Sequence, residues 1–399
     1  MLSRRHRKLI VIEAQYSLVL APAALTLDAA AGTGTVQLAT AIPTLAWTAA
    51  VTPAAPWLTL SSTAGTGSRA LSFTFTANTA GTSRQATIQV GTAVVTITQR
   101  AAPPAVTATG PVAGAGETQS FVFRFTNPNG FQNRGVVNAL INRALDGGRE
   151  CYIAYSVPAG VLFLVNDAGV DSGLSAPLVL GSGGNVSNGQ CQINGTGSSA
   201  VGSGNLLTLK LNIGFRAGFA GNQVIYLAER DQGAGNSGWA TMGFHSVPGA
   251  PVTYPNAISM APAAGSAAAS TLTFTYEDQS NSTNIQTAWA LVNTALDGRG
   301  ACYVAYFAPG NILFLFPDDG DAAGLTNMVL AGTASLENSQ CRVNAQGSSV
   351  VRSGGRLTLN LNLTFKPGFA GPKAVWLALQ TLTAVTAPWK VSGAWQVPP

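Results

Sequence analysis

Few side chains in this sequence have the type and placement that catalysis requires. A nucleophile needs a general base beside it, most often histidine, and the chain has only His6 and His245. An internal duplication, described below, places Trp395 at the position of His245, so we interpret this position as the surface of a C-terminal strand. The sequence therefore offers no support for a Ser-His-Asp hydrolase or a histidine-rich metal site, and we expect no enzymatic activity.

Paired carboxylates are the second arrangement that could carry out chemistry, because glycoside hydrolysis uses two of them. Asp146 and Asp297 occupy matching positions in the two copies of the duplication, each within Leu-Asp-Gly. That composition is typical of turns, and no glutamate recurs between the copies. We therefore interpret these acids as turn residues, and a polysaccharide hydrolase is the least favoured function.

Oxygen-bearing side chains at expected strand ends form a weaker pattern. Calcium prefers several oxygen ligands, which Asn127, Asp167 and Asp231 could supply. The second copy has Thr381 where the first has Asp231, and neither EF-hand nor nonapeptide spacing occurs. Ordinary Asx turns are the favoured interpretation, calcium is the alternative, and no other cofactor is expected.

Aromatic residues next to polar loops point to ligand binding. An indole can stack on a sugar ring while neighbouring amides and hydroxyls form hydrogen bonds with the hydroxyl groups of the sugar. Asn236 and Trp239 supply that mixture, and Trp389 repeats the tryptophan in the second copy. Trp57 is a further candidate near the N-terminus. Burial in a core is the competing interpretation for each of these tryptophans.

Residues 121–248 and 272–398 align nearly end to end, which shows an internal duplication. Three residues separate Ala-Leu-Asp-Gly from Cys151 in the first copy and from Cys302 in the second, and Cys191 and Cys341 each follow a glutamine. None of the four lies in a C-x-x-C pair, so a zinc knuckle or redox motif is not supported. One cysteine pair per copy predicts the disulfides Cys151–Cys191 and Cys302–Cys341 and an oxidising compartment.

Hydrophobic periodicity predicts strands throughout both copies. Phenylalanines at 121, 123 and 125 alternate with other residues, as expected for a strand with one buried face. Residues 137–145 and 288–296 instead show apolar residues at helical spacing. They predict one short helix per copy, ending at Gly147 or Gly298. A strand with an apolar edge is the alternative.

The N-terminal part differs from the duplicated copies. It has no cysteine, and short strands are expected over 35–38, 71–75, 86–90 and 93–97, the last two joined by the two-residue turn at 91–92. About 85 residues with this spacing suit a small immunoglobulin-like sandwich.

This part resembles the BACON family. The resemblance rests on Pro56-Trp57-Leu58-Thr59-Leu60, on Asn78 with Arg84 six residues later, and on the terminal Val-Thr-Ile-Thr-Gln of 95–99. It implies an immunoglobulin-like module of bacterial extracellular proteins that binds carbohydrate or mucin. The two cysteine-containing copies resemble modules that follow such domains in acidobacterial surface proteins, and that resemblance implies no function.

Composition and charge narrow the class of partner. Of the 399 residues, 46% are hydrophobic and only 9% charged, against a usual charged fraction of about 25%. The net charge of +5 owes much to the four basic residues within 4–8. The remaining body is nearly neutral, which argues against a nucleic-acid partner. No apolar run approaches the roughly 20 residues of a membrane span.

We therefore expect an all-β chain of three tandem sandwich modules. A tail or degraded export signal occupies residues 1–16, the BACON-like domain 17–101, and the two duplicated repeats 105–249 and 254–399. We expect a monomeric, non-catalytic binding or adhesion protein, extracellular or at the cell surface, with a polysaccharide or surface glycan as partner. A structural spacer or scaffold is the alternative.

Overall fold

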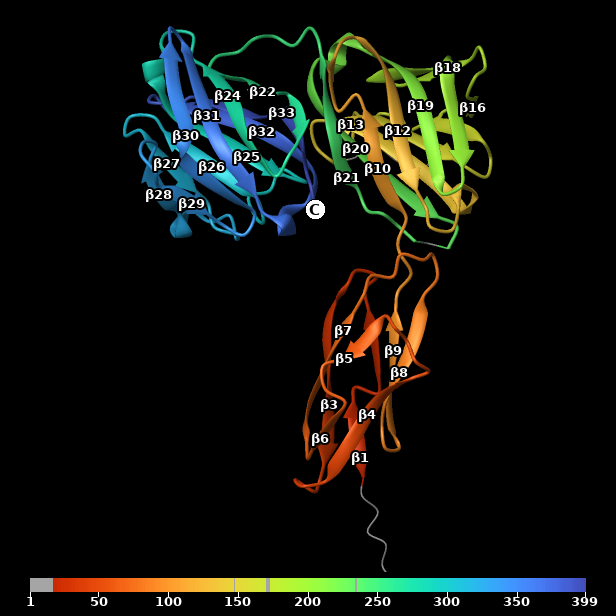
Figure 1. The fold of residues 1–399 in the computed structure, drawn as a ribbon. Helices are drawn as coiled ribbons and strands as arrows, with labels where there is room; N and C mark the ends of the chain where they lie inside the picture. The colour runs from red at the N-terminus through yellow and green to blue at the C-terminus, as the bar shows by residue number, and fades with distance from the viewer. Residues whose placement is uncertain (1–16, 147, 170–172, 234) are drawn as a thin grey trace, which may run out of the picture. The chain divides into compact units, whose positions relative to one another are not determined.

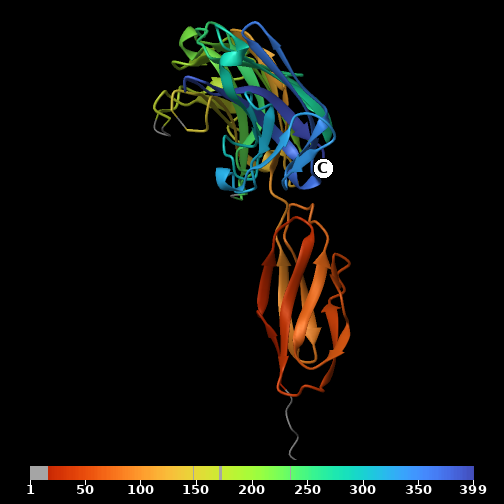
Figure 2. The ribbon, with the colours of Figure 1, turned by 90° about the vertical axis from the view of Figure 1, so that its left-hand side faces the viewer.

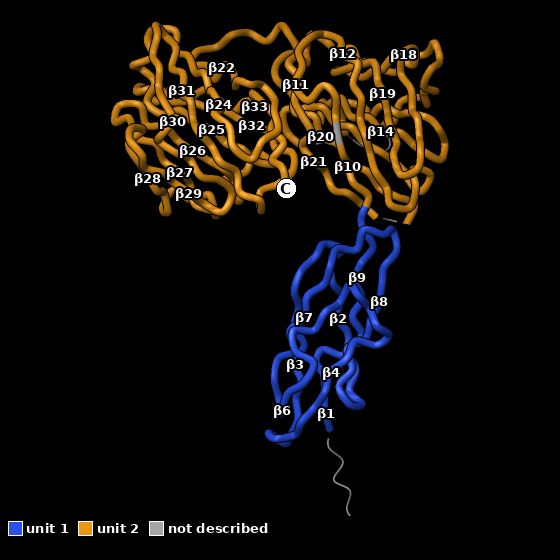
Figure 3. Tube along the Cα trace, in the orientation of Figure 1, with its two compact units in different colours: residues 1–103 blue, residues 104–399 orange. Residues whose placement is uncertain are grey.

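The computed structural model describes residues 17–399 except 147, 170–172 and 234. The expected tail at 1–16 and the helix end at Gly147 therefore lie outside the described residues. The chain divides into two compact units, residues 1–103 and 104–399 (Figure 3). The second unit contains both copies of the duplication. None of the described helices is long and apolar enough to cross a membrane.

The N-terminal unit is a sandwich of two sheets (Figures 1 and 2). The first sheet has the order β1 (Leu18–Ala21), β3 (Gly32–Thr40), β7 (Arg69–Phe75) and β5 (Leu58–Leu60). The second has the order β2 (Ala24–Leu27), β9 (Ala93–Gln99), β8 (Arg84–Val90), β4 (Ala46–Thr52) and β6 (Ala64–Thr66). The strands β2 and β9 are parallel, and the other neighbours are antiparallel.

Alternating side chains from the two sheets form the core of this unit. Val36, Phe73 and Ile88 are fully buried, each flanked by more exposed neighbours, as the period of two in a strand requires. The strands β8 and β9 join through a two-residue turn in which Gly91 has a φ of 58°, a conformation that favours glycine. The four strands expected from the sequence are confirmed.

The first repeat is a larger sandwich. Its five-stranded sheet has the order β10 (Ala105–Gly110), β12 (Thr118–Thr126), β19 (Leu206–Phe215), β18 (Cys191–Ser203) and β17 (Asn185–Ser187). Its seven-stranded sheet has the order β11 (Ala113–Ala115), β21 (Ala240–Val247), β20 (Gly221–Asp231), β13 (Arg134–Asn142), β14 (Cys151–Ser156), β15 (Val161–Leu164) and β16 (Leu178–Val179). Inward side chains of both sheets, including the three phenylalanines of β12, form one core.

The second repeat has the same strand order. Its five-stranded sheet contains β22 (Asn256–Ala261), β24 (Ala269–Glu277), β31 (Arg356–Phe365), β30 (Cys341–Ser353) and β29 (Ser335–Glu337). Its seven-stranded sheet contains β23 (Ala264–Ser266), β33 (Thr386–Val397), β32 (Gly371–Thr381), β25 (Ile285–Asn293), β26 (Cys302–Phe307), β27 (Ile312–Leu315) and β28 (Thr326–Val329). The fold is all-β, and its tandem sandwich modules match the expectation.

Two disulfides connect the sheets. Cys151 at the start of β14 bonds Cys191 at the start of β18, and Cys302 on β26 bonds Cys341 on β30. All four cysteines are buried, and no cysteine is free. The predicted pairing is confirmed. Such bonds are typical of proteins in oxidising compartments.

The helix expected after residue 137 is wrong, because residues 134–142 and 285–293 form the strands β13 and β25. Val137 and Ile141 face the core of their own sandwich, whereas Leu140 packs against the other repeat. A strand buried on both faces loses the polar alternation that distinguishes strand from helix. The helices of the described residues are single 3₁₀ turns, one of them just before each of these strands, at Phe131–Asn133 and Ser282–Asn284.

The interpretation of His245 as a surface residue is also wrong. The imidazole is fully buried, with its ring centroid 4.9 Å from that of Phe215. Its Nε2 lies 2.8 Å from the carbonyl oxygen of Gly116, so this nitrogen carries the proton. In the second repeat the indole of Trp395 donates to the equivalent carbonyl, that of Ala267, at 2.9 Å. Both residues fill the same core position, and burial lowers the pKa of His245.

The two repeats pack against each other through matching faces of their seven-stranded sheets. Leu140, Val224, Tyr226 and Phe244 of the first repeat and their counterparts Leu291, Ala374, Trp376 and Ala394 of the second belong to one buried cluster. Hydrogen bonds cross this contact from Thr241 Oγ1 to the Thr294 carbonyl and from Asn222 Nδ2 to the Val391 carbonyl, both at 2.6 Å. The contact resembles the interface of a symmetric dimer, in which both partners use the same surface.

A buried ion pair distinguishes the first repeat from the second. The Nε of Arg134 donates to Glu229 Oε2 at 2.8 Å, and both side chains are fully buried. The positions that correspond to them in the second repeat are Ile285 and Leu379, which are equally buried. Removing water from two charges costs several kcal/mol per ion, which their attraction repays only in part. The same buried position is therefore filled by an ion pair in the first repeat and by an apolar pair in the second.

We predict that each disulfide stabilises its repeat mainly through loop closure. Separations of 40 and 39 residues correspond to about 4 kcal/mol each in the chain-entropy model. Replacing Cys151 and Cys191 together by alanine should lower the free energy of unfolding by about that amount, measured by urea denaturation. Free thiols, or a peptide linking Cys191 to Cys302 in non-reducing peptide mapping, would contradict the assignment.

Replacing the ion pair by the residues of the other repeat should be nearly neutral. Arg134→Ile or Glu229→Leu alone leaves a buried, unpaired charge and should cost about 3–5 kcal/mol. The double variant removes both charges and should return to within about 1 kcal/mol of the native chain, or above it. Urea denaturation of the four chains measures this. If the double variant loses as much free energy of unfolding as the two single variants together, the attraction within the pair exceeds the cost of its desolvation.

The stability difference between the native chain and the double variant should depend on pH. Burial raises the pKa of Glu229 to about 7 from its ordinary value of 4.5, against the lowering effect of Arg134. A group whose pKa is higher in the folded state stabilises the chain below its unfolded pKa, and this contribution is lost as the pH rises through the folded value. The native chain should therefore lose stability relative to the double variant between about pH 4.5 and 7. Parallel denaturation curves at all pH values would refute it.

Candidate functional site

The residues that carry the family resemblance hold together one end of the N-terminal sandwich. The guanidinium of Arg84 lies 4.7 Å from the centroid of the Trp57 ring, and it donates to Gln99 Oε1 at 2.8 Å and to the Thr76 carbonyl at 2.7 Å. Asn78 Nδ2 donates to two further carbonyls. Trp57 is half-buried and packs against the core. Because the Arg84 guanidinium lies over the Trp57 ring, a structural role for this tryptophan is favoured over stacking on a sugar.

Trp239 is the most exposed of the described tryptophans, with 37% of its surface accessible. It is the last residue of the eight-residue connection between β20 and β21, at 232–239, and its ring meets that of Tyr152 edge to face, with centroids 5.7 Å apart. Asn236 is exposed on the same loop. Its Oδ1 accepts a hydrogen bond from the Gly238 amide at 2.8 Å. The predicted pair of amide and indole is thus present on one loop.

The loop that carries Trp239 is fastened at its base. Asp231 exchanges hydrogen bonds with Gly235, through its own amide at 2.9 Å and its carboxylate at 2.6 Å. Ser237 is bonded to the backbone of Glu229 in both directions. Glu229 itself is held by the buried ion pair. The loop is therefore connected to a rigid part of the sandwich, a condition that favours recognition by loops.

The second repeat uses the equivalent tryptophan differently. Its connection between β32 and β33 is only four residues long, at 382–385, so Trp389 lies within strand β33. Its ring meets Tyr303 edge to face, with centroids 5.8 Å apart, and is half-buried. Trp389 also lines a cleft of about 380 Å³ between the two repeats. The two predicted tryptophans therefore lie in equivalent positions but in different surroundings.

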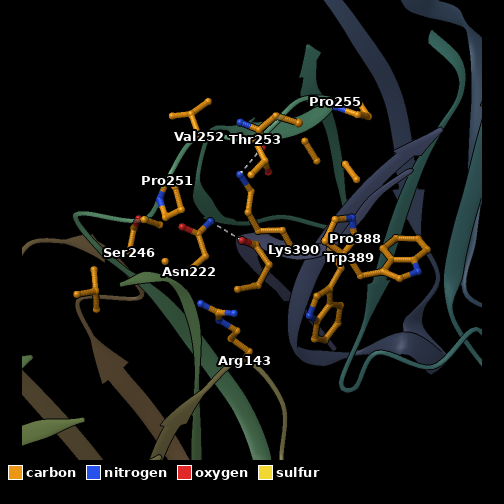
Figure 4. A pocket seen from close by; sticks show the side chains of 18 of the residues that line it. Arg143, Asn222, Ser246, Pro251, Val252, Thr253, Pro255, Pro388, Trp389 and Lys390 are labelled. Atoms are coloured by element: carbon orange, nitrogen blue, oxygen red, sulfur yellow. Dashed lines mark hydrogen bonds between the residues drawn. The ribbon is translucent and has the colours of Figure 1, made fainter. Parts of the chain in front are cut away.

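The cleft is formed by both repeats and by the segment that joins them. Arg143, Asn222 and Ser246 come from the first repeat, and Trp389 and Lys390 from the second (Figure 4). Linker residues 248–253 also line it. A volume of this size is within the range of small-ligand sites. The cleft therefore depends on the packing of the two repeats.

Among the described residues, two cations line this cleft and no carboxylate does. Arg143 is exposed, and its Nη2 donates to the Ala220 carbonyl at 2.9 Å. Lys390 is half-buried, and its Nζ donates to Asn256 Oδ1 at 3.1 Å. Burial lowers the pKa of Lys390. The electrostatics of the cleft are therefore positive.

The sequence could not single out these cleft residues. Arg143, Asn222 and Lys390 correspond to Thr294, Pro372 and Ala240 in the other copy. Because these residues do not recur, the similarity of the two copies gives no signal for them. The available signal was the opposite one: polar side chains at positions where the copies differ.

The acids considered for chemistry lie in turns. Asp146 accepts from Asn142 Nδ2 at 2.9 Å, and Asp297 accepts from the amide and side chain of Arg299, which lowers its pKa to about 2. The calcium candidates Asn127, Asp167 and Asp231 each accept a backbone amide at 2.6–2.9 Å. Within the described ranges, no three His, Cys, Asp or Glu side chains gather as a metal-binding group.

Comparison with known proteins identifies the N-terminal module. Residues 46–100 match the model of the BACON family, described as "Putative binding domain, N-terminal". This range covers β4 to β9 and includes Trp57, Asn78, Arg84 and Gln99. A comparison of the sequence with curated proteins finds no match.

Among solved structures, a Bacteroides ovatus GH5 xyloglucanase in complex with a XXXG heptasaccharide is 25% identical, with a TM-score of 0.20. The match covers 23% of this chain and 20% of the enzyme's length. Two tandem fragments of titin are 10% identical, with TM-scores of 0.19 and 0.22, and cover 94% and 96% of this chain and 95% and 98% of their own. These scores are low, so the fold assignment rests on the sheets described above. The chain therefore joins a BACON domain at its N-terminal end to two packed copies of a disulfide-bonded β-sandwich.

Proposed function

We propose that this chain is a non-catalytic binding protein of the extracellular space or cell surface, and that its ligand is a neutral polysaccharide. The observation that carries the proposal is the exposed indole of Trp239, which meets the half-buried ring of Tyr152, with the exposed amide of Asn236 on the same fastened loop. An indole face and a neighbouring amide are the two groups that a sugar ring needs, one for its apolar face and one for its hydroxyls.

Three further features support this proposal. Residues 46–100 of the N-terminal module match the model of a family described as "Putative binding domain, N-terminal". The two buried disulfides are typical of proteins in oxidising, extracellular surroundings. Outside the basic N-terminal segment, the chain is nearly neutral, and a protein of low charge has little long-range attraction for a polyanion.

The loop in the first repeat is preferred over the N-terminal module as the binding site. Arg84 covers the ring of Trp57, whereas Trp239 is 37% exposed. The ring of Trp239 also has a second aromatic side chain, Tyr152, beside it. Rigid aromatic residues at the centre of a contact commonly dominate its binding energy.

Affinity electrophoresis on neutral polysaccharides tests this proposal. Replacing Trp239 by alanine should weaken retention by about 10–30-fold, as expected for an aromatic anchor. Replacing Asn236 by alanine should weaken it less. Tyr254→Ala is the matched control, because this exposed aromatic residue, 42% accessible, lies outside the loop. Thermal denaturation of each variant checks that the fold is intact.

Fragments 17–101 and 105–399 locate the binding site, since the structure divides near this boundary. Retention of the second fragment alone is the expected result. Retention of the first alone would move the site to the BACON domain. Failure of both fragments and of the full chain to bind any neutral polymer would favour the structural spacer instead.

A further inference from the structure

The cleft between the repeats holds positive charge that no acid of the described structure neutralises. Arg143 and Lys390 both line it. Neither takes part in any of the ion pairs found among the described residues. Their hydrogen-bond acceptors, a carbonyl and an amide oxygen, are neutral. Two cations that line one cavity without a counterion repel each other, and the cost is larger where water is partly excluded.

The hydrogen-bonding capacity of these cations is only partly used. A guanidinium has five N–H donors and an ammonium has three. Within the described residues, Arg143 and Lys390 each make one such bond. The remaining donors could bond to the two oxygens of a carboxylate, and hydrogen bonds of that kind are about twice as strong as neutral ones.

The other walls of the cleft suit a sugar ring rather than a bare anion. Trp389 supplies an aromatic surface, and Asn222, Ser246 and Thr253 supply amide and hydroxyl groups (Figure 4). A cavity of about 380 Å³ lies at the lower end of the range for small-ligand sites. Apolar walls with a few polar groups are the usual composition of such sites.

We propose that the inter-repeat cleft binds one acidic sugar residue, a uronic acid, with its carboxylate between Arg143 and Lys390 and its ring against Trp389. This site is separate from the Trp239 loop and does not depend on the proposed binding of a neutral polysaccharide. Two cations can offer hydrogen-bond donors to both oxygens of the one carboxylate that such a residue carries. They are too few for a nucleic acid or another extended polyanion, whose binding requires many phosphate or sulfate contacts.

The matched pair of probes is trigalacturonate and its fully methyl-esterified form, which has the same rings without charge. Tryptophan fluorescence titration of the full chain at low ionic strength should show at least about tenfold tighter binding of the acid, the difference expected from charge-assisted hydrogen bonds. The preference should shrink as salt is added, because mobile ions screen the attraction.

Two variants separate the contributions of charge and ring. Arg143→Gln with Lys390→Gln should abolish the preference for the acid, while Lys210→Gln, an exposed lysine on β19, should leave it unchanged. Trp389→Ala should weaken binding of trigalacturonate without making acetate a better competitor. Thermal denaturation confirms folding in each case.

Several results would overturn the proposal. These are equal binding of the acid and its ester, undiminished binding of the acid by the double glutamine variant, or no binding of trigalacturonate at all. Displacement of the sugar by acetate at equal concentration would show that the cleft accepts any small anion. This assay uses an acidic ligand and the retention assay uses neutral polymers, so either proposal can fail while the other stands.

Discussion

The apolar outer face of each seven-stranded sheet is the constraint on which the second unit depends. In an antiparallel sandwich, one face of a sheet packs on the core and the other can face water. Here Leu140 and Tyr226 on one copy, and Leu291 and Trp376 on the other, make the second face apolar as well. The copies bury these faces against each other. Because the same surface serves both partners, one duplicated sequence supplies both halves of the contact.

This contact also determines where the cleft lies. Packing of β20 and β21 against the second repeat brings Asn222 of β20 to the Val391 carbonyl and Thr241 of β21 to the Thr294 carbonyl. Both repeats and the linker at 248–253 enclose the space that Arg143 and Lys390 line. Cations that are far apart in the sequence, and unrelated by the duplication, thereby line one cavity.

The copies differ most informatively at buried polar positions. Arg134 with Glu229 in one copy, and Ile285 with Leu379 in the other, fill one volume with either an ion pair or an apolar pair. His245 and Trp395 likewise satisfy equivalent backbone carbonyls with different rings. Such exchanges are possible because the shape of the site and its hydrogen bonds matter more to the fold than the charge of a paired group. The ion pair occurs in the copy with the longer loop that carries Trp239. Ser237 of this loop bonds the backbone of Glu229, so the buried difference between the copies lies next to a difference at their surface.

In the N-terminal unit, the family signature is a set of structural contacts. Arg84 covers Trp57 and bonds Gln99, and Asn78 ties two carbonyls of separate segments. A buried polar group needs partners to offset its desolvation, and these residues supply them for one another. Their presence identifies the module without marking a binding surface.

The sequence by itself determined the strands of the N-terminal sandwich, the duplication and both disulfides, because period-two burial and paired cysteines are local or repeated signals. It also indicated Asn236 and Trp239 as loop residues. It could not place residues 137–145 or His245, whose surroundings come from distant segments: Leu140 is covered by the other repeat, and His245 by Phe215. The cleft of Arg143 and Lys390 likewise exists only in the tertiary structure, since the packing of two sheet faces, rather than any motif, places these side chains along one cavity.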